Sequence, residues 1–409
     1  MRIREEDEKT VEKPVISVVG LSGFPARLRK NIGDMRFNLQ EFSGSLGDLG
    51  LFIPIVVALV SITGMDGGSI LFFAGLLNIV TGLVFNQPVP VQPMKAIAAV
   101  AIAEGLMPGE IAAAGFATGV IVLFLGLTGL VTVAERIIPR PVVRGIQLGV
   151  GLKLAAKGVT LALASGWWAW DGRIVALAGA ALVLLTYHRA RFPSAVVLFA
   201  GGFLLMAINR PEALTGLPIG WGGPIVTLPD WSEWQSGFLL GTLPQVPLTL
   251  LNSVIAVCAL SEDLFPGRGI KTRLMASSVG MMNIASCFFG AMPMCHGSGG
   301  LAGQHRFGAR TGGSVVILGV AKVVIALVFG TAVISVLSAY PSSVLGILLI
   351  FSGLELTLPA RDCTKKNAFL VAAATACGIF AANTAVGFVM GLIASFFLIR
   401  KRPDPGVAA

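Results

Sequence analysis

The sequence PVPVQPMKAIAA, from Pro88 to Ala99, is broken by prolines within a long apolar region. Proline removes a backbone donor and pushes the preceding residue into an extended conformation, so a continuous helix cannot run through Pro88 and Pro90. The residues after Pro93 are good helix formers, which predicts a helix over Pro93–Glu104 with Pro93 in its first turn. This stretch therefore predicts an extended segment that turns into a half-helix.

The composition indicates a polytopic membrane protein. Hydrophobic residues make up 55% of the 409 residues and charged residues only 12%, more apolar chain than a soluble core absorbs. The 51 glycines are typical of membrane helices that approach each other closely. The five cysteines have no C-x-x-C spacing, so we interpret them as core residues or free thiols. We expect no metal site, disulfide framework or cofactor.

A lysine follows the interrupted backbone directly. Irregular backbone at membrane depth is tolerated only where it is buried in protein or lines a cavity. The N-terminus of a half-helix beside the Lys95 cation is typical of an anion site. Alternatively, Lys95 only pairs with Asp48 of the first span and so holds the broken helix, because an intramembrane charge needs a partner. Gln92 either caps the half-helix or donates to a ligand.

A second interrupted segment lies about half a chain later. Asn283 precedes Pro293 by the same interval as Asn78 precedes Pro88. Upstream, the region of Gln245 matches the region of Asp48 in the same order. Paired interrupted segments at corresponding positions of two halves indicate the binding site of a secondary transporter.

The second copy predicts main-chain donors. Ser298 is a natural N-cap for a half-helix over Ser298–Gln304, and Gly299 and Gly300 leave backbone N–H groups open for an oxyanion. His296 in the extended part is interpreted either as a structural donor or as a proton carrier. The candidate substrate-binding residues of both copies are Ser45, Asp48, Gln92, Lys95, Gln245, Asn252, His296, Ser298, Gly299 and Gly300.

Glu355 is a further ionisable residue within an apolar segment. It either pairs with Lys153 or Lys157 or serves as a proton site, and the sequence does not choose between these hypotheses.

The charge map predicts the orientation. Fourteen apolar segments follow residue 40. If the N-terminus lies inside, the only basic residues of the outer segments are Arg173 and Arg210, whereas the inner loops are rich in Arg and Lys. This asymmetry fits the positive-inside rule, and it explains the net charge of +9 without a nucleic-acid partner. Because seven spans is an odd number, the two halves have opposite orientations.

The sequence thus predicts an all-α polytopic protein with 14 transmembrane segments in two inverted repeats of seven spans. The third and tenth spans are the half-helices. We expect it in the lipid bilayer of the cell (inner) membrane, with both termini cytoplasmic and no cleavable signal peptide.

Four segments resemble the signatures of the molybdate-transporter family, a distant relative of the sulfate permeases. They are SLGDLGLFIPI (45–55), PVPVQPMKAIAAVAI (88–102), LPQVPLTLLNSVIAVCALSEDLFP (243–266) and GAMPMCHGSGGLAGQHRFGARTGG (290–313). The resemblance covers about 41–400. It implies the inverted fold shared with sulfate permeases and uracil permease, and it implies high-affinity molybdate uptake. The family's functional positions fall on Gln92, Lys95, His296, Ser298, Gly299 and Gly300.

The resemblance also implies a division into two moving domains. The core domain is expected over 41–136 and 237–337 (spans 1–4 and 8–11), and the gate domain over 137–209 and 338–400 (spans 5–7 and 12–14). The remaining regions are predicted from polarity and charge and not from the resemblance. They are a polar N-terminal tail (1–40), with an interfacial helix near Phe24–Phe37, an extracellular loop (210–236) and a C-terminal tail (401–409).

Other functions stay open at this stage. Sulfate, tungstate and molybdate are tetrahedral dianions with similar demands, so a sulfate or other oxyanion permease is the first alternative. A nucleobase site would want a carboxylate on the eighth or tenth span, where this chain offers Gln245 and glycine. An intramembrane enzyme is disfavoured because the spans lack H-E-x-x-H, paired-aspartate and G-x-S-x-G constellations. Proton or sodium coupling and a homodimer are left undecided.

Overall fold

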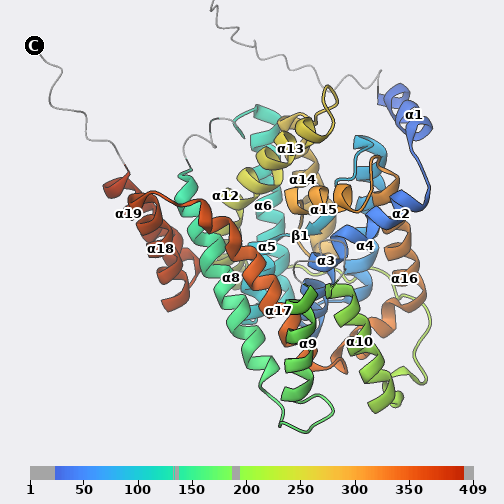
Figure 1. Ribbon diagram of the computed structural model, residues 1–409. Coiled ribbons are helices and arrows are strands. Elements are labelled where there is room, and N and C mark those ends of the chain that lie inside the picture. The colour runs from blue at the N-terminus through green and yellow to red at the C-terminus, as the bar shows by residue number, and fades with distance from the viewer. Residues whose placement is uncertain (1–23, 132, 134–137, 187–193, 400–409) are drawn as a thin grey trace, which may run out of the picture.

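The computed structural model describes residues 24–131, 133, 138–186 and 194–399, and these are mostly helical (Figure 1). The expectations for residues 1–23 and 401–409, and the inner arginines Arg136, Arg189 and Arg191, lie outside the described residues.

The elements of the first half run in chain order to α10, and α1 falls where a helix near Phe24–Phe37 was predicted. They are α1 (Phe24–Asp34), α2 (Leu39–Ser45), η1 (Leu46–Asp48), α3 (Leu49–Ala58), η2 (Leu59–Thr63), α4 (Gly67–Phe85), β1 (Val91–Pro93), α5 (Lys95–Glu104), α6 (Pro108–Thr128), α8 (Arg140–Ala162), α9 (Arg173–Thr186) and α10 (Ser194–Asn209).

The second half repeats the pattern of long helices around a short strand. Its elements are η3 (Pro211–Leu214), α11 (Trp231–Ser236), η4 (Gly237–Thr242), α12 (Leu243–Leu248), η5 (Thr249–Ile255), α13 (Ala256–Leu264), α14 (Thr272–Ser286), η6 (Cys287–Phe289), β2 (Met294–His296), α15 (Ser298–Arg306), α16 (Gly313–Ser338), α17 (Ser342–Thr357), η7 (Leu358–Asp362), α18 (Lys366–Ala381) and α19 (Thr384–Leu398).

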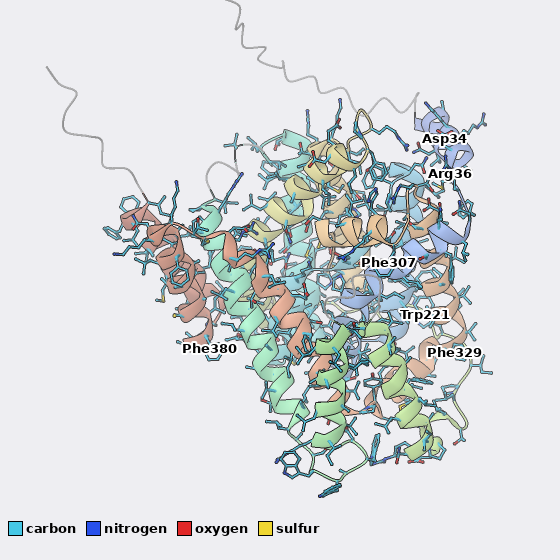
Figure 2. The ribbon with its side chains drawn as sticks, viewed as in Figure 1. Asp34, Arg36, Trp221, Phe307, Phe329 and Phe380 are labelled. Carbon is cyan, nitrogen blue, oxygen red and sulfur yellow. The ribbon has the colours of Figure 1, made fainter. Side chains whose placement is uncertain are left out.

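Apolar helices long enough to cross a membrane confirm a membrane protein. The described residues contain five such helices, or six if the bent pair formed by Leu39–Asp48 and Phe52–Thr63 is one span. Large apolar side chains such as Phe329 and Phe380 are about half exposed at the periphery of the bundle (Figure 2), as expected for surfaces that face lipid.

Glycines let the long helices pack in pairs. Helix α4 lies along α16, α6 along α14, and α8 along α17. A Cβ added at Gly75 of α4 would lie 2.6 Å from the Gly319 carbonyl oxygen of α16, and one added at Gly151 of α8 would lie 2.6 Å from the Gly353 carbonyl oxygen of α17. Side chains at these positions would push the backbones apart, so the glycines set the helix spacing.

The eighth predicted span is one long, irregular helix. Trp231–Leu264 is continuous, but it contains two π-helical segments, η4 and η5, on either side of α12. Pro244 and Pro247 lie in α12, and each lacks the N–H that an α-helix needs at that position. The local widening follows from these two prolines and places Gln245 and Asn252 toward the centre of the molecule.

Candidate functional site

Two short strands lie side by side within the bundle. β1 pairs with β2 in antiparallel register, with Gln92 opposite Cys295. Asn78 Oδ1 accepts a hydrogen bond of 2.7 Å from the Val91 N–H, and Asn283 Oδ1 accepts one of 2.7 Å from the Met294 N–H. The two asparagines that the sequence placed at equal intervals therefore hold the two extended segments in equivalent ways.

The first half-helix begins later than predicted. Pro93 lies in β1, Met94 is the N-cap, and α5 starts at Lys95. The prediction of Pro93 in the first helical turn was wrong, because the pairing with β2 continues through Pro93 and the Met94 N–H donates to the Pro293 carbonyl at 2.8 Å.

A long-range contact closes the N-terminus of α5. Gln245 Oε1 accepts hydrogen bonds from the Ala96 and Ile97 N–H groups at 2.9 and 3.2 Å. Its amide nitrogen donates to Thr249 Oγ1 at 2.8 Å, which fixes the orientation of the amide. The Gln245 side chain therefore supplies the capping hydrogen bonds of α5, a role that the sequence analysis gave as one alternative for Gln92. Gln92 donates instead to Asp48.

The N-terminus of α15 is open by comparison. Gly297 is its N-cap and Ser298 its first helical residue, so Ser298 is not the cap that the sequence predicted. The Gly297 carbonyl already accepts from the Gly300 and Leu301 N–H groups, at 3.0 and 3.1 Å. Within the described residues, the Ser298 and Gly299 N–H groups have no acceptor, and Gly299 is exposed. This helix end presents free donors to whatever lies before it.

A cavity of about 250 Å³ lies in front of both half-helices. Lys95 contributes from α5, Ser298 and Gly299 from α15, and Asn252 from η5. The opposite wall is built by residues of α8, α17 and η7, and it comprises Gln147, Leu154, Ser352, Glu355, Leu356, Leu358 and Pro359. Ile55 of α3 completes the lining.

A second cavity adjoins the first. It has a volume of about 240 Å³ and shares Gln147 and Asn252 with the first cavity. Arg140 and Arg144 of α8 line it, and Arg144 donates to Gln147 Oε1 at 3.0 Å and pairs with Asp362 at 2.8 Å. Basic side chains thus line a cavity next to the first one, toward the Arg140 end of α8.

The charge of Lys95 is available to a ligand. Lys95 makes no hydrogen bond or ion pair in the part of the chain that the structure describes, and it is only half-buried. Its charge acts on both Asp48 and Glu355. The predicted direct pair between Lys95 and Asp48 is not formed among these residues, because the Gln92 amide occupies one carboxylate oxygen of Asp48.

The remaining candidate residues lie behind the cavity wall. His296 is fully buried, and its ring nitrogens lie 3.3 Å from the Pro90 carbonyl and 3.0 Å from Ser278 Oγ. These contacts fit the structural role for this histidine. Gly300 packs against the Gln92 side chain, and Ser45 donates to the Phe42 carbonyl at 2.7 Å. Neither residue lines the cavity.

Lys322 is a buried charge that the sequence reasoning missed. It lies on α16 with 3% of its surface exposed, and its ammonium group is 3.4 Å from the centre of the Phe52 ring. Within the described residues the ammonium has no hydrogen-bond partner, and neither does the second oxygen of Asp48. The charges of Lys322 and Asp48 act on each other. A lysine in the middle of the apolar stretch GSVVILGVAKVVIALVFG was the signal that would have revealed it.

Known proteins resemble this chain in sequence. The family described as "Molybdate transporter of MFS superfamily" matches residues 40–154 and 237–356. Molybdate transporter 2 of Arabidopsis thaliana is 40% identical over 89% of this chain and 88% of its own length. Molybdate transporter 1 of Chlamydomonas reinhardtii is 33% identical over 87% of this chain and 90% of its own length.

Solved structures resemble the chain in fold. The transmembrane domain of the cyanobacterial bicarbonate transporter BicA aligns with a TM-score of 0.63 and 16% identity, over 88% of this chain and 98% of that one. Murine Slc26a9, an anion transporter in the inward-facing state, aligns with a TM-score of 0.68 and 15% identity, over 97% of this chain and 76% of that one. At these identities the likeness concerns the fold alone. The extent and identity of the sequence matches show that the chain belongs to the molybdate transporter family.

Proposed function

We propose that this protein is a secondary transporter that takes up the molybdate dianion. One observation carries the proposal: the unpaired Lys95 ammonium, the open N–H groups at Ser298 and Gly299, and the Asn252 side chain line one cavity. A dianion that leaves water at this depth needs charged and hydrogen-bonding partners. The relatives named as molybdate transporters support this substrate and favour transport over enzymatic activity.

The inverted repeat is part of the proposal. Under two repeats of seven spans, α4 and α14 are equivalent, as are α6 and α16. The packing of α4 on α16 then corresponds to that of α14 on α6, and the antiparallel β1–β2 pair lies between the halves. The full count of 14 spans starts from the six long spans, with the bent pair counted as one. It adds the apolar helices α9, α10, α18 and α19, which are only 10–17 residues long, the helices α8 and α14, and the half-helices α5 and α15.

The two walls of the cavity support transport by alternating access. We assign spans 1–4 and 8–11 to a core domain and spans 5–7 and 12–14 to a gate domain. Lys95, Asn252, Ser298 and Gly299 then belong to the core, and Gln147 and Glu355 belong to the gate. A movement of one domain against the other would open the cavity to one side at a time.

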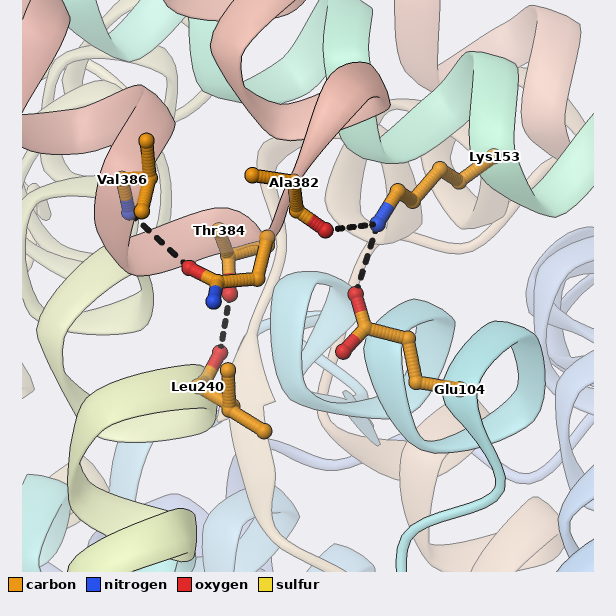
Figure 3. A network of polar contacts seen from close by, with 7 residues as sticks. Glu104, Lys153, Leu240, Ala382, Thr384 and Val386 are labelled. Carbon is orange, nitrogen blue, oxygen red and sulfur yellow. Dashed lines mark hydrogen bonds and ion pairs between the residues drawn. The ribbon is translucent and has the colours of Figure 1, made fainter.

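Polar contacts join the two proposed domains away from the arginine-lined cavity. Lys153 of α8 pairs with Glu104, at the end of α5, at 2.8 Å and donates to the Ala382 carbonyl at 3.3 Å (Figure 3). Thr384 Oγ1 of α19 donates to the Leu240 carbonyl at 2.6 Å. We interpret this arrangement as a state closed at these contacts and open through the Arg140 end, which the positive-inside rule assigns to the cytoplasm.

Uptake into proteoliposomes tests the function. The purified protein should accumulate labelled molybdate, and excess unlabelled tungstate should compete. If sulfate competes equally well, the protein is a general permease for tetrahedral oxyanions. If liposomes with and without the protein take up equal molybdate, the proposal is wrong.

Thiol labelling tests the orientation. In a cysteine-free background, Gly222→Cys and Arg268→Cys should react with an impermeant thiol reagent from opposite sides, outside and inside respectively. A Cβ at Gly222 meets no atom within 4 Å, so the substitution is tolerated sterically. Labelling of both variants from one side would contradict the proposed topology.

A further inference from the structure

A carboxylate lines the cavity proposed for a dianion. Glu355 lies near the end of α17, is exposed, and faces the same cavity as Lys95. Across the described chain, Glu355 makes no hydrogen bond or ion pair, and its electrostatic partner is Lys95. An ionised carboxylate in an anion site repels the substrate, so its presence requires an explanation.

Two of the neighbouring charges are engaged elsewhere. Lys153, offered by the sequence as a partner of Glu355, pairs with Glu104, and Arg144 pairs with Asp362. Among the described residues that line the cavity, Lys95 and Glu355 are the charged ones. The other charged residues on the elements packed against α17 are Arg140, Lys157, Arg173 and Arg361.

The charge balance of the cavity depends on Glu355. With Glu355 ionised, the Lys95 charge is cancelled, and the α15 N-terminus adds only about half a positive charge. With Glu355 protonated, Lys95 and the helix end together present about one and a half positive charges to the dianion. Binding of the dianion and protonation of Glu355 therefore favour each other, and this coupling is reciprocal.

We infer that Glu355 is the proton-binding site through which uptake of the oxyanion is coupled to the proton gradient. The inference rests on the proposed function. A proton from the solution on the side of entry binds the Glu355 carboxylate as the dianion occupies the cavity. Both are released on the other side, so one net negative charge crosses per cycle. In the empty protein, the Glu355 carboxylate and the Lys95 ammonium neutralise each other, which allows the return step without substrate.

Binding measurements at different pH values test the coupling. For the purified protein, one coupled proton predicts that molybdate affinity rises by up to about tenfold for each unit by which pH falls. Glu355→Gln mimics the protonated state, so its affinity should lose this pH dependence and resemble that of the wild type at low pH. Glu355→Asp keeps a carboxylate and should keep the dependence. The matched control Glu212→Gln removes an exposed carboxylate whose partner is Arg210 and should follow the wild type.

Proton flux gives a second readout. Addition of molybdate to proteoliposomes, with the membrane potential clamped, should acidify the lumen with the wild type and not with Glu355→Gln. Absence of proton movement with the wild type, a requirement for sodium instead, or an unchanged pH dependence in Glu355→Gln would each overturn the inference. If the wild type binds no molybdate at any pH, the proposed function itself fails, and this result is distinct from the others.

Discussion

The two half-helices both begin at the same cavity, but their N-termini differ there. Helix α5 starts with a charged residue, Lys95, and its next two N–H groups are taken by Gln245. Helix α15 starts with Ser298 and Gly299, which carry no charge and leave their N–H groups open. The difference indicates a division of labour in which one repeat supplies the full positive charge and the other supplies main-chain donors.

The largest expected effect is that of substituting Lys322. Its result could contradict the division of labour between the two half-helices. Lys322→Met removes the stronger of the two lysine charges that act on the buried Asp48 carboxylate, which should cost about 3 kcal/mol of folding free energy. Thermal unfolding of the purified protein measures the loss. Asp48→Asn in the same chain should restore both stability and molybdate uptake, because Lys322 is not among the residues that line the cavity. Recovery of stability without uptake would make Lys322 a ligand and would contradict the assignment of the charge to Lys95.

The next effect concerns the open donors of α15. Ser298→Pro removes one N–H at the first helical position, where proline is tolerated, and the extended Gly297 before it accommodates the ring. Loss of a hydrogen bond to a charged ligand should weaken molybdate binding by about 10–100-fold. Isothermal titration calorimetry measures the affinity, and Ser298→Ala, which keeps the N–H, is the control. Equal affinity of the two variants would show that this donor does not contact the dianion.

The smallest effect is that of substituting Gln245, which caps the N-terminus of α5. Gln245→Ala leaves the Ala96 and Ile97 N–H groups without their acceptor and should lower the unfolding free energy by about 1–2 kcal/mol. The thermal midpoint reports this change. Molybdate affinity should fall less than in Ser298→Pro, because these two N–H groups do not face the ligand. A larger loss of affinity than of stability would mean that Gln245 binds the substrate directly.

The sequence predicted the broken segments well because their cause is local. Prolines interrupt the helices, and the equally spaced Asn78 and Asn283 anchor the strands that follow. The capping by Gln245 was not predictable, because its partners lie far along the chain. Lys322 was overlooked because one lysine leaves an apolar pattern nearly unchanged. The role of Glu355 stayed open because the sequence offered both Lys153 and Lys157 as partners; among the described residues Lys153 pairs with Glu104, and Glu355 forms no ion pair.

The direct test of the account is molybdate uptake by Lys95→Ala alone and combined with Asp48→Asn. If Lys95 contacts the dianion, both variants should fold and both should lose uptake by at least about 30-fold, because a charge-assisted contact is gone. Lys157→Ala, on α8 and outside the cavity lining, should transport like the wild type. Near-wild-type uptake by the double variant would show that Lys95 only balances Asp48, and would contradict the account.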